Sequence, residues 1–98
     1  MSDIKFEWDP NKASSNIKKH DVSFDEAQSV FFDSYARLIP DPDSSFGEER
    51  FIILGQSRDF QALVVCHCYR DPDDNIRIIS ARKADKSERK QYEEYRYA

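Results

Sequence analysis

Three apolar stretches separated by two short polar turns constrain the fold of this chain more than any other feature. The stretches cover residues 50–56, 61–69 and 75–82, and each is rich in the β-branched and aromatic side chains typical of strands. The intervening segments, residues 57–59 and 71–74, consist mainly of turn-forming residues. Connections this short join antiparallel neighbours, because a parallel crossover needs a dozen residues or more. The sequence therefore predicts an antiparallel meander of three strands.

Helices are predicted before and after this meander. Alternation over residues 4–8 predicts a first strand, and an Asp-Pro start predicts a helix over 9–19. A Ser-x-x-Glu capping box predicts a second helix over 23–33, and a short strand follows over 37–40. A last helix opens at residue 85, where Glu88 has capping-box spacing and could also orient Arg82. The order β-α-α-β-β-β-β-α predicts an α+β fold with helices packed on a small antiparallel sheet.

The last two strands of the meander carry polar residues that suggest a site on the sheet. We take Tyr69 to pair with Arg77 across the turn, which places His67 opposite Ile79. This register predicts an open face that holds His67, Tyr69, Arg77 and Lys83. It predicts a core face under the helices that holds Val64, Cys66, Cys68, Ile76 and Ile78 and continues through Ser80 and Arg82. Either proton transfer or a structural hydrogen bond explains a histidine at position 67.

Charge is segregated along the chain, although the net charge is only -4. Residues 12–20 carry three lysines and no acid, residues 21–49 carry eight acids and one arginine, and residues 76–98 carry seven bases and four acids. Such a chain can present a basic patch to phosphate, and ordinary solvation of the helices explains the same lysines equally well. His20 ends the first predicted helix, where the helix dipole or a proton-transfer role accounts for it.

Length and composition limit the remaining possibilities. A chain of 98 residues leaves room for one core, so a single domain over residues 1–98 is expected, and 13% aromatic residues argue against disorder. The longest apolar run, 62–66, is far shorter than the roughly 20 residues that span a bilayer. With no apolar signal region at the N-terminus, a cytoplasmic protein is expected. Cys66 and Cys68 are poorly spaced for a disulfide or a zinc site, which predicts reduced thiols and no metal.

The chain resembles the BrnT toxins of type II toxin–antitoxin pairs (the DUF497 family), over nearly its whole length. The segments that carry the resemblance are Phe6-Glu-Trp-Asp-Pro-Asn-Lys12, Asn16-x-x-Lys19-His20-x-Val22-Ser-Phe24-x-Glu-Ala27, Glu49-Arg50-Phe, Gly55, Arg77-Ile-Ile-Ser-Ala-Arg82-Lys83 and Glu88-Arg89-x-x-Tyr92. One departure is Asp21, which stands where the family often has glycine.

The resemblance implies a RelE-like fold and an endoribonuclease that cuts RNA and arrests growth. It also implies neutralisation by a BrnA-like antitoxin, which carries the DNA-binding domain, so that operator DNA is bound only through the antitoxin. Attack by the ribose 2′-hydroxyl needs a proton carrier and cations for the charge-rich phosphorane, and needs neither metal nor cofactor.

Roles in this reaction are assigned to residues of the matching segments and of the predicted open face. His20 or His67 is the expected proton carrier. The expected phosphate ligands are Lys19, Arg50, Arg77 and Arg82. The expected RNA-contacting residues are Lys12, Asn16, Lys83 and Tyr92.

A non-enzymatic binding module is the alternative function. Apolar residues between the polar groups of the predicted open face, namely Leu63, Val65, Ile79 and Ala81, would then bind the antitoxin. In that case the protein would act as a co-repressor, through its complex with the antitoxin on operator DNA. A repressor that binds DNA by itself is disfavoured, because the second predicted helix is acidic.

Overall fold

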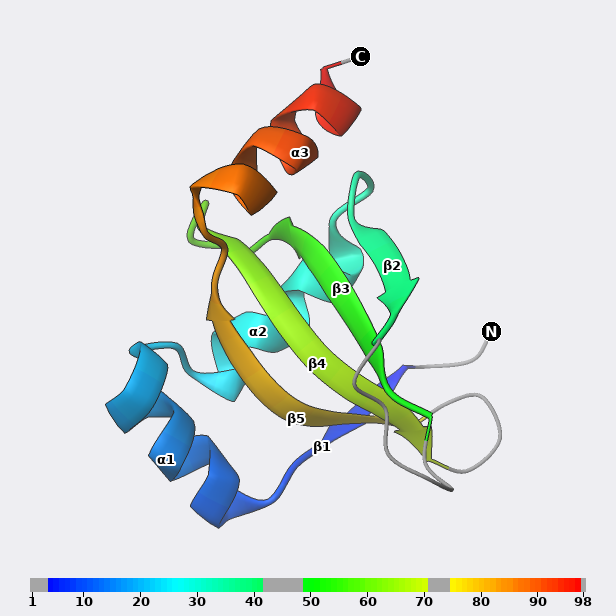
Figure 1. The fold of residues 1–98 in the computed structure, drawn as a ribbon. Coiled ribbons are helices and arrows are strands. Elements are labelled where there is room, and N and C mark those ends of the chain that lie inside the picture. The colour runs from blue at the N-terminus through cyan, green and yellow to red at the C-terminus, as the bar shows by residue number, and fades with distance from the viewer. Residues whose placement is uncertain (1–3, 42–48, 71–74, 98) are drawn as a thin grey trace.

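A computed structural model describes residues 4–41, 49–70 and 75–97, and five strands form one sheet in the order β1-β5-β4-β3-β2 (Figure 1). β1 runs parallel to β5, and every other pair of neighbours is antiparallel. The elements are β1 (Lys5–Glu7), α1 (Pro10–His20), α2 (Phe24–Ser29), η1 (Val30–Phe32), β2 (Arg37–Pro40), β3 (Phe51–Gln56), β4 (Ala62–Arg70), β5 (Asn75–Lys83) and α3 (Lys86–Arg96). The predicted α+β class and element order are confirmed.

The sheet has one covered face and one partly open face. α1, α2 and η1 lie on the covered face, where the main core forms from Val22, Phe24, Ala27, Val30, Ile53, Leu63, Val65, Ile78 and Ala81. α3 packs at one end of the other face through Tyr92, which contacts Leu54, Val64 and Ala84. The remainder of that second face is therefore left without a covering helix (Figure 1).

The ends of α1 follow from local chemistry. The carboxylate of Asp9 accepts a hydrogen bond from the backbone N–H of Asn11 at 2.8 Å, and Pro10 occupies the first turn as predicted. At the other end Asp21 has a φ of 56°, and its N–H donates to the carbonyl of Ile17 at 2.9 Å. Aspartate is one of the few residues other than glycine that tolerate this left-handed conformation at the end of a helix.

α2 begins as predicted but uses its acidic residue differently. The Ser23 hydroxyl accepts from the N–H of Glu26 at 3.0 Å, which is half of a capping box. The Glu26 side chain does not complete the box: it is buried and accepts from the Ser57 hydroxyl at 2.6 Å and from Gln61 at 3.0 Å. Glu26 therefore ties α2 to the β3–β4 turn, and the helix gives way to η1 before residue 33.

A β-bulge in β5 makes the predicted strand register wrong. Cys66 pairs with Ser80, but the next residue, His67, pairs with Ile78, so Ile79 has no partner across the strand. The extra residue shifts the alternation of β5 by one. Ile76, Ile78 and Ala81 consequently face the covered core, whereas the residues after the bulge, Ser80 and Arg82, face the open side.

The faces predicted for β4 are also wrong. Leu63, Val65 and His67 are fully buried under the helices, and Val64 and Cys66 lie on the other face of the sheet. Apolar residues occupy consecutive positions here, so alternation could not decide which face turns inward.

The turn predicted over residues 71–74 lies outside the residues that the structure describes. None of the helices within the described ranges is long and apolar enough to cross a membrane.

Candidate functional site

A cavity of about 320 Å³ lies on the open face of the sheet, beside the end of α1. The polar and ionisable residues that line it come from segments far apart in the chain. They are His20 from the end of α1, Asp41 and Arg50 from the two sides of the β2–β3 connection, Cys66 from β4, and Ser80 and Arg82 from β5. Three of the six predicted catalytic residues, His20, Arg50 and Arg82, thus meet in one cavity.

Arg82 is held in place by Glu88. The Nη1 and Nη2 groups of Arg82 donate to the two carboxylate oxygens of Glu88 at 2.8 and 2.9 Å. These hydrogen bonds lower the pKa of Glu88 and raise that of Arg82, so both groups stay charged. Nη1 also donates to the carbonyl of Lys83 at 3.4 Å. Within the described residues this leaves the Nε–H and one Nη2–H of Arg82 to bind a phosphate side-on.

The Glu88 carboxylate also caps α3. It accepts from the N–H of Asp85 at 2.9 Å, while the Asp85 side chain accepts from the N–H of Glu88 at 2.8 Å. Both expected roles of Glu88, helix cap and partner of Arg82, are therefore found in the structure.

Cys66 and Asp41 form a second contact in the cavity. The Cys66 thiol lies 3.6 Å from a carboxylate oxygen of Asp41 and is placed to donate to it. Burial raises the pKa of the Cys66 thiol to about 11, and the nearby Asp41 carboxylate adds to the shift. The thiol is consequently neutral at physiological pH and is a poor nucleophile. Both cysteines are free, as the sequence predicts.

His20 reaches the cavity because α1 is fastened to β5 through Asn16. The buried Asn16 amide donates to the carbonyls of Val22 at 2.9 Å and Ala81 at 2.7 Å, and it accepts from the N–H of Ala81 at 3.1 Å. Ala81 directly precedes Arg82, so the same contact that seats the helix also fixes the separation of His20 from Arg82. Asn16 is only 5% exposed and its amide is occupied by these bonds, so the structure assigns it a structural contact, and its contact with RNA stays a prediction.

His67 does not lie in the cavity. Its side chain is fully buried on the covered face, among the rings of Phe31, Phe51 and Tyr69. Its Nδ1 lies 3.2 Å from the carbonyl of Val65, and Nε2 has no hydrogen-bond partner among the described residues. Burial lowers the pKa of His67, which favours the neutral ring. The predicted open-face position is wrong, and the structural interpretation fits the contacts.

Two further predicted site residues are occupied elsewhere. Arg77 donates to Glu7 of the neighbouring β1 at 2.7 Å and does not line the cavity. Tyr92 is 4% exposed, and its hydroxyl donates to Asp33 at 2.5 Å, which anchors α3. Burial together with the Asp33 carboxylate raises the pKa of Tyr92 to about 12. Tyr92 thus packs α3 on the sheet, and its contact with RNA stays a prediction.

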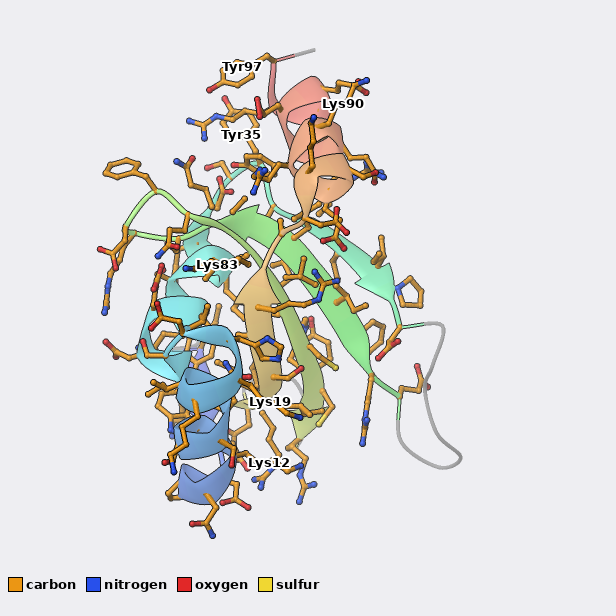
Figure 2. The ribbon with its side chains drawn as sticks, turned by 60° about the vertical axis from the view of Figure 1, so that its left-hand side comes forward. Lys12, Lys19, Tyr35, Lys83, Lys90 and Tyr97 are labelled. Carbon is orange, nitrogen blue, oxygen red and sulfur yellow. The ribbon has the colours of Figure 1, made fainter. Side chains whose placement is uncertain are left out.

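The lysines expected to bind RNA or its phosphates are exposed on α1 and at the end of β5. Figure 2 shows Lys12 and Lys19 along α1, with Lys83 at the end of β5 above them and Lys90 apart from them on α3. Lys83 makes only a long contact, with its Nζ 3.9 Å from a carboxylate oxygen of Asp21. Lys12, Lys19 and Lys83, which we call the lysine ridge, are all exposed residues.

Sequence reasoning missed three polar residues of the cavity. The sequence analysis gives Asp41 no role and places Cys66 and Ser80 on the core face, but all three line the cavity. Ser80 belongs to the same segment as Arg82, so a correct register would have revealed it. In the described ranges, no three His, Cys, Asp or Glu side chains are grouped closely enough to hold a metal ion.

Comparison with known proteins identifies the family. The family described as "Ribonuclease toxin, BrnT, of type II toxin-antitoxin system" matches residues 8–88, which include His20, Arg50 and Arg82. This chain belongs to the BrnT family of ribonuclease toxins. BrnT membership places the chain in a type II toxin–antitoxin system and so implies a protein antitoxin as its partner.

A BrnT structure supports the fold independently. The 1.1 Å crystal structure of the Brucella abortus ribonuclease toxin BrnT superposes with a TM-score of 0.66, at 21% identity over 85% of this chain and 99% of that chain. At this identity the likeness establishes the BrnT fold, and the RelE-like label stays an expectation. No curated protein matches the chain.

Proposed function

We propose that this chain, as a single toxin domain over residues 1–98, is an endoribonuclease that cuts RNA in the cavity lined by His20, Arg50 and Arg82 to arrest growth. The observation that carries the proposal is their convergence on the open face of the sheet from positions 20, 50 and 82. A proton carrier and two permanent cations around one hollow are what cleavage of a phosphodiester requires.

The reaction starts when the ribose 2′-hydroxyl loses its proton and attacks the adjacent phosphorus. The bond from phosphorus to the 5′-oxygen then breaks, and the 5′-oxygen takes up a proton. We assign one of these proton transfers to His20, since histidine ordinarily carries protons near neutral pH. Asp41, whose carboxylate lines the same cavity, is our candidate for the other.

The arginines stabilise the charge of the phosphorane. Arg82 offers the phosphate its free Nε–H and Nη2–H, and Glu88 keeps the guanidinium fixed so that no reorganisation is needed during reaction. Arg50 lines the same cavity. The lysine ridge lies along α1, whose last residue His20 lines the cavity, and at the end of β5, and it offers single charges to neighbouring phosphates of the strand.

The remaining parts of the proposal concern partners and location. We propose that the antitoxin is BrnA-like, that operator DNA is contacted only through it, and that the toxin acts in the cytoplasm, where its RNA substrate is found. Metal independence is part of the proposal too, since the cations are supplied by arginine. Undiminished cleavage in the presence of a chelator is the expected result.

The test is inducible expression in a bacterium, with growth and total RNA integrity followed for wild type, His20→Ala and Arg82→Ala. We expect arrest with RNA decay for the wild type only, while both variants fold and bind the antitoxin. Lys90→Ala, a basic residue of α3 distant from the lysine ridge, is the control and should remain toxic. Full toxicity of a His20→Ala, Arg82→Ala double variant would refute the assignment.

The binding-module alternative loses most of the surface on which it depended. Leu63 and Val65 are fully buried, and Ala81 is 1% exposed, because the helices cover that face. Ile79, the fourth residue, is only partly buried, but it lines the cavity of the proposed site. No other observation favours a non-enzymatic role.

A further inference from the structure

Four aromatic side chains are exposed where η1, the β3–β4 turn and the end of α3 meet. The exposed fractions are 83% for Phe60, 74% for Tyr97, 67% for Phe32 and 44% for Tyr35. We call these four residues the aromatic corner. Single exposed apolar residues are common on proteins, but a group of them at one place marks a binding surface.

Phe60 is an unfavourable residue for the turn in which it stands. The turn closes through hydrogen bonds from the N–H of Phe60 to the carbonyl of Ser57 at 2.9 Å and from the N–H of Ser57 to that of Gln61 at 2.8 Å. The φ of Phe60 is 63°, a left-handed conformation that costs a non-glycine residue about 1–2 kcal/mol. Neither the backbone nor burial favours phenylalanine at this position, so a contact made by its ring is the better explanation.

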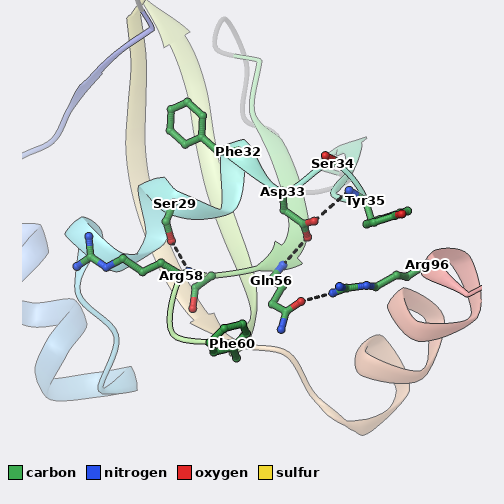
Figure 3. A pocket seen from close by; sticks show the side chains of 10 residues that line it. Ser29, Phe32, Asp33, Ser34, Tyr35, Gln56, Arg58, Phe60 and Arg96 are labelled. Atoms are coloured by element: carbon green, nitrogen blue, oxygen red, sulfur yellow. Dashed lines mark hydrogen bonds between the residues drawn. The ribbon is translucent and has the colours of Figure 1, made fainter.

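The aromatic corner contains two hollows, with Phe60 between them. One has a volume of about 380 Å³ and lies between Phe60 and Phe32, which Figure 3 shows on either side of it. The other has a volume of about 250 Å³ and lies between Phe60 and Tyr97. The guanidinium of Arg96 stacks 5.2 Å from the ring centre of Tyr35 and 5.4 Å from that of Tyr97, which joins the two sides. A protruding ring with a hollow on either side is a shape that receives side chains from a partner.

The charges around these hollows do not suit RNA. No described lysine lines either of them. Their three arginines are offset by Asp33 and Glu93, and Arg58 is in addition paired with Asp25 at 2.5 Å. Aromatic residues and arginine without lysine are typical of protein interfaces, whereas RNA affinity comes largely from unpaired cations. The lysine ridge lies on another part of the molecule.

We propose that the aromatic corner is a docking surface for the protein antitoxin, whose apolar side chains fill the hollows on either side of Phe60. The occupant follows from the type II membership of the family, which pairs this toxin with a protein, and from the protein-like composition of the surface. Neither hollow shares a residue with the cavity that holds His20 and Arg82. The inference rests on the antitoxin partner and is independent of which residues cut RNA.

The test measures the affinity of purified toxin variants for the purified antitoxin of the same system. Phe60→Asn removes the ring and, because asparagine tolerates the left-handed conformation, leaves the turn intact. Phe32→Ser removes a second exposed ring. Ile4→Asn is the matched control, since Ile4 is 47% exposed and precedes β1 at the opposite edge of the sheet.

We expect Kd to rise on the order of 30-fold for Phe60→Asn and Phe32→Ser, as for an interface hot spot, and to stay unchanged for Ile4→Asn. RNA cleavage by the free variants should equal that of the wild type.

Unchanged affinity in both variants would overturn the proposal. So would lost RNA cleavage with normal antitoxin affinity, which assigns the surface to RNA, or altered sedimentation of the free toxin with normal affinity, which assigns it to a second copy. A wild type that binds antitoxin but cuts no RNA would contradict the proposed function alone.

Discussion

The carboxylate of Glu88 connects the last helix to the candidate site. One of its oxygens accepts both from Arg82 and from the backbone N–H of Asp85, and the other accepts from Arg82 alone. A charged, twice-bonded arginine has little freedom to turn away from the cavity. Glu88 is therefore a positioning residue, which acts on the substrate only through Arg82.

Replacing Glu88 with glutamine separates these two roles. Glutamine can still cap the helix, but it loses the charge that holds Arg82. We expect Glu88→Gln to lower kcat for RNA cleavage about tenfold with little change in KM, since roughly 1.4 kcal/mol of transition-state stabilisation is lost. Steady-state cleavage of a short RNA measures this.

Asp85→Ala is the matched control for the cap. It removes the Asp85 side chain, which accepts from the N–H of Glu88, and should cost about 1 kcal/mol of unfolding free energy while kcat is preserved. A Glu88→Gln enzyme with wild-type kcat would show that Arg82 needs no such support.

His67 makes stability depend on pH. Burial lowers its pKa below the ordinary 6.5, so the unfolded chain binds the extra proton more readily than the folded one. Stability is therefore greatest above about pH 6.5 and falls as the pH drops from there toward the folded pKa.

His67→Phe is expected to reduce this acid sensitivity. Phenylalanine fits among the neighbouring rings and leaves no unpaired ring nitrogen. Urea unfolding at pH 7.5 and pH 5 should show a smaller loss of stability for the variant than for the wild type, with RNA cleavage retained. Loss of cleavage in a folded His67→Phe protein would restore His67 as a catalytic candidate.

At the scale of elements, the position of α1 depends on one buried amide. Asn16 makes three hydrogen bonds, two of them to Ala81 of β5. Apolar packing holds α1 only weakly, because its largest apolar side chain, Ile17, is 48% exposed. The helix that carries His20 is thus held on the sheet largely by polar contacts and by its half-buried Ala13.

Asn16→Ala is expected to lower the free energy of unfolding by about 3 kcal/mol, because three hydrogen bonds are lost and buried backbone groups are left unpaired. Cleavage should fall as well, since His20 is no longer fixed relative to Arg82. Chemical unfolding and an RNA cleavage assay measure the two effects. Lys12→Ala, an exposed change on the same helix, should leave stability within about 0.5 kcal/mol of wild type; an equal loss in both variants would contradict this account.

For the whole molecule, the arrangement of charge matters more than its sum. The chain carries a net charge of -4, yet the three exposed lysines of the lysine ridge lie along α1 and at the end of β5 (Figure 2). Asp25 and Glu26 belong to α2 and Asp33 follows η1, whereas Lys12 and Lys19 belong to α1. An acidic protein can in this way offer RNA one basic part of its surface.

Salt dependence tests this arrangement. Each of the changes Lys12→Gln, Lys19→Gln and Lys83→Gln should reduce the slope of log affinity for single-stranded RNA against log salt by about 0.7. Lys90→Gln, which lies apart on α3, should leave the slope unchanged. Titrations with a catalytically inactive toxin at several salt concentrations give these slopes. A Lys90 effect as large as the others would mean that RNA follows another path.

The sequence by itself determined the element order, the helix starts at Asp9, Ser23 and Asp85, and the α+β class, because caps, turns and apolar periodicity are local signals. The sequence also indicated the family, since the matching residues form short contiguous motifs. Only part of the predicted site lies together in the structure. His20, Arg50 and Arg82 line one cavity, whereas His67, Arg77 and Tyr92 lie elsewhere.

Tertiary structure decided which side of the sheet each residue faces. β4 is apolar on consecutive positions, so its inward face depends on where the helices pack. The bulge at Ile79 then turns Ser80 and Arg82 toward the open side, although Ile76 and Ile78 of the same strand remain in the core. Local periodicity does not reveal the inserted residue here, because Ile78 and Ile79 are both apolar and either could face the core.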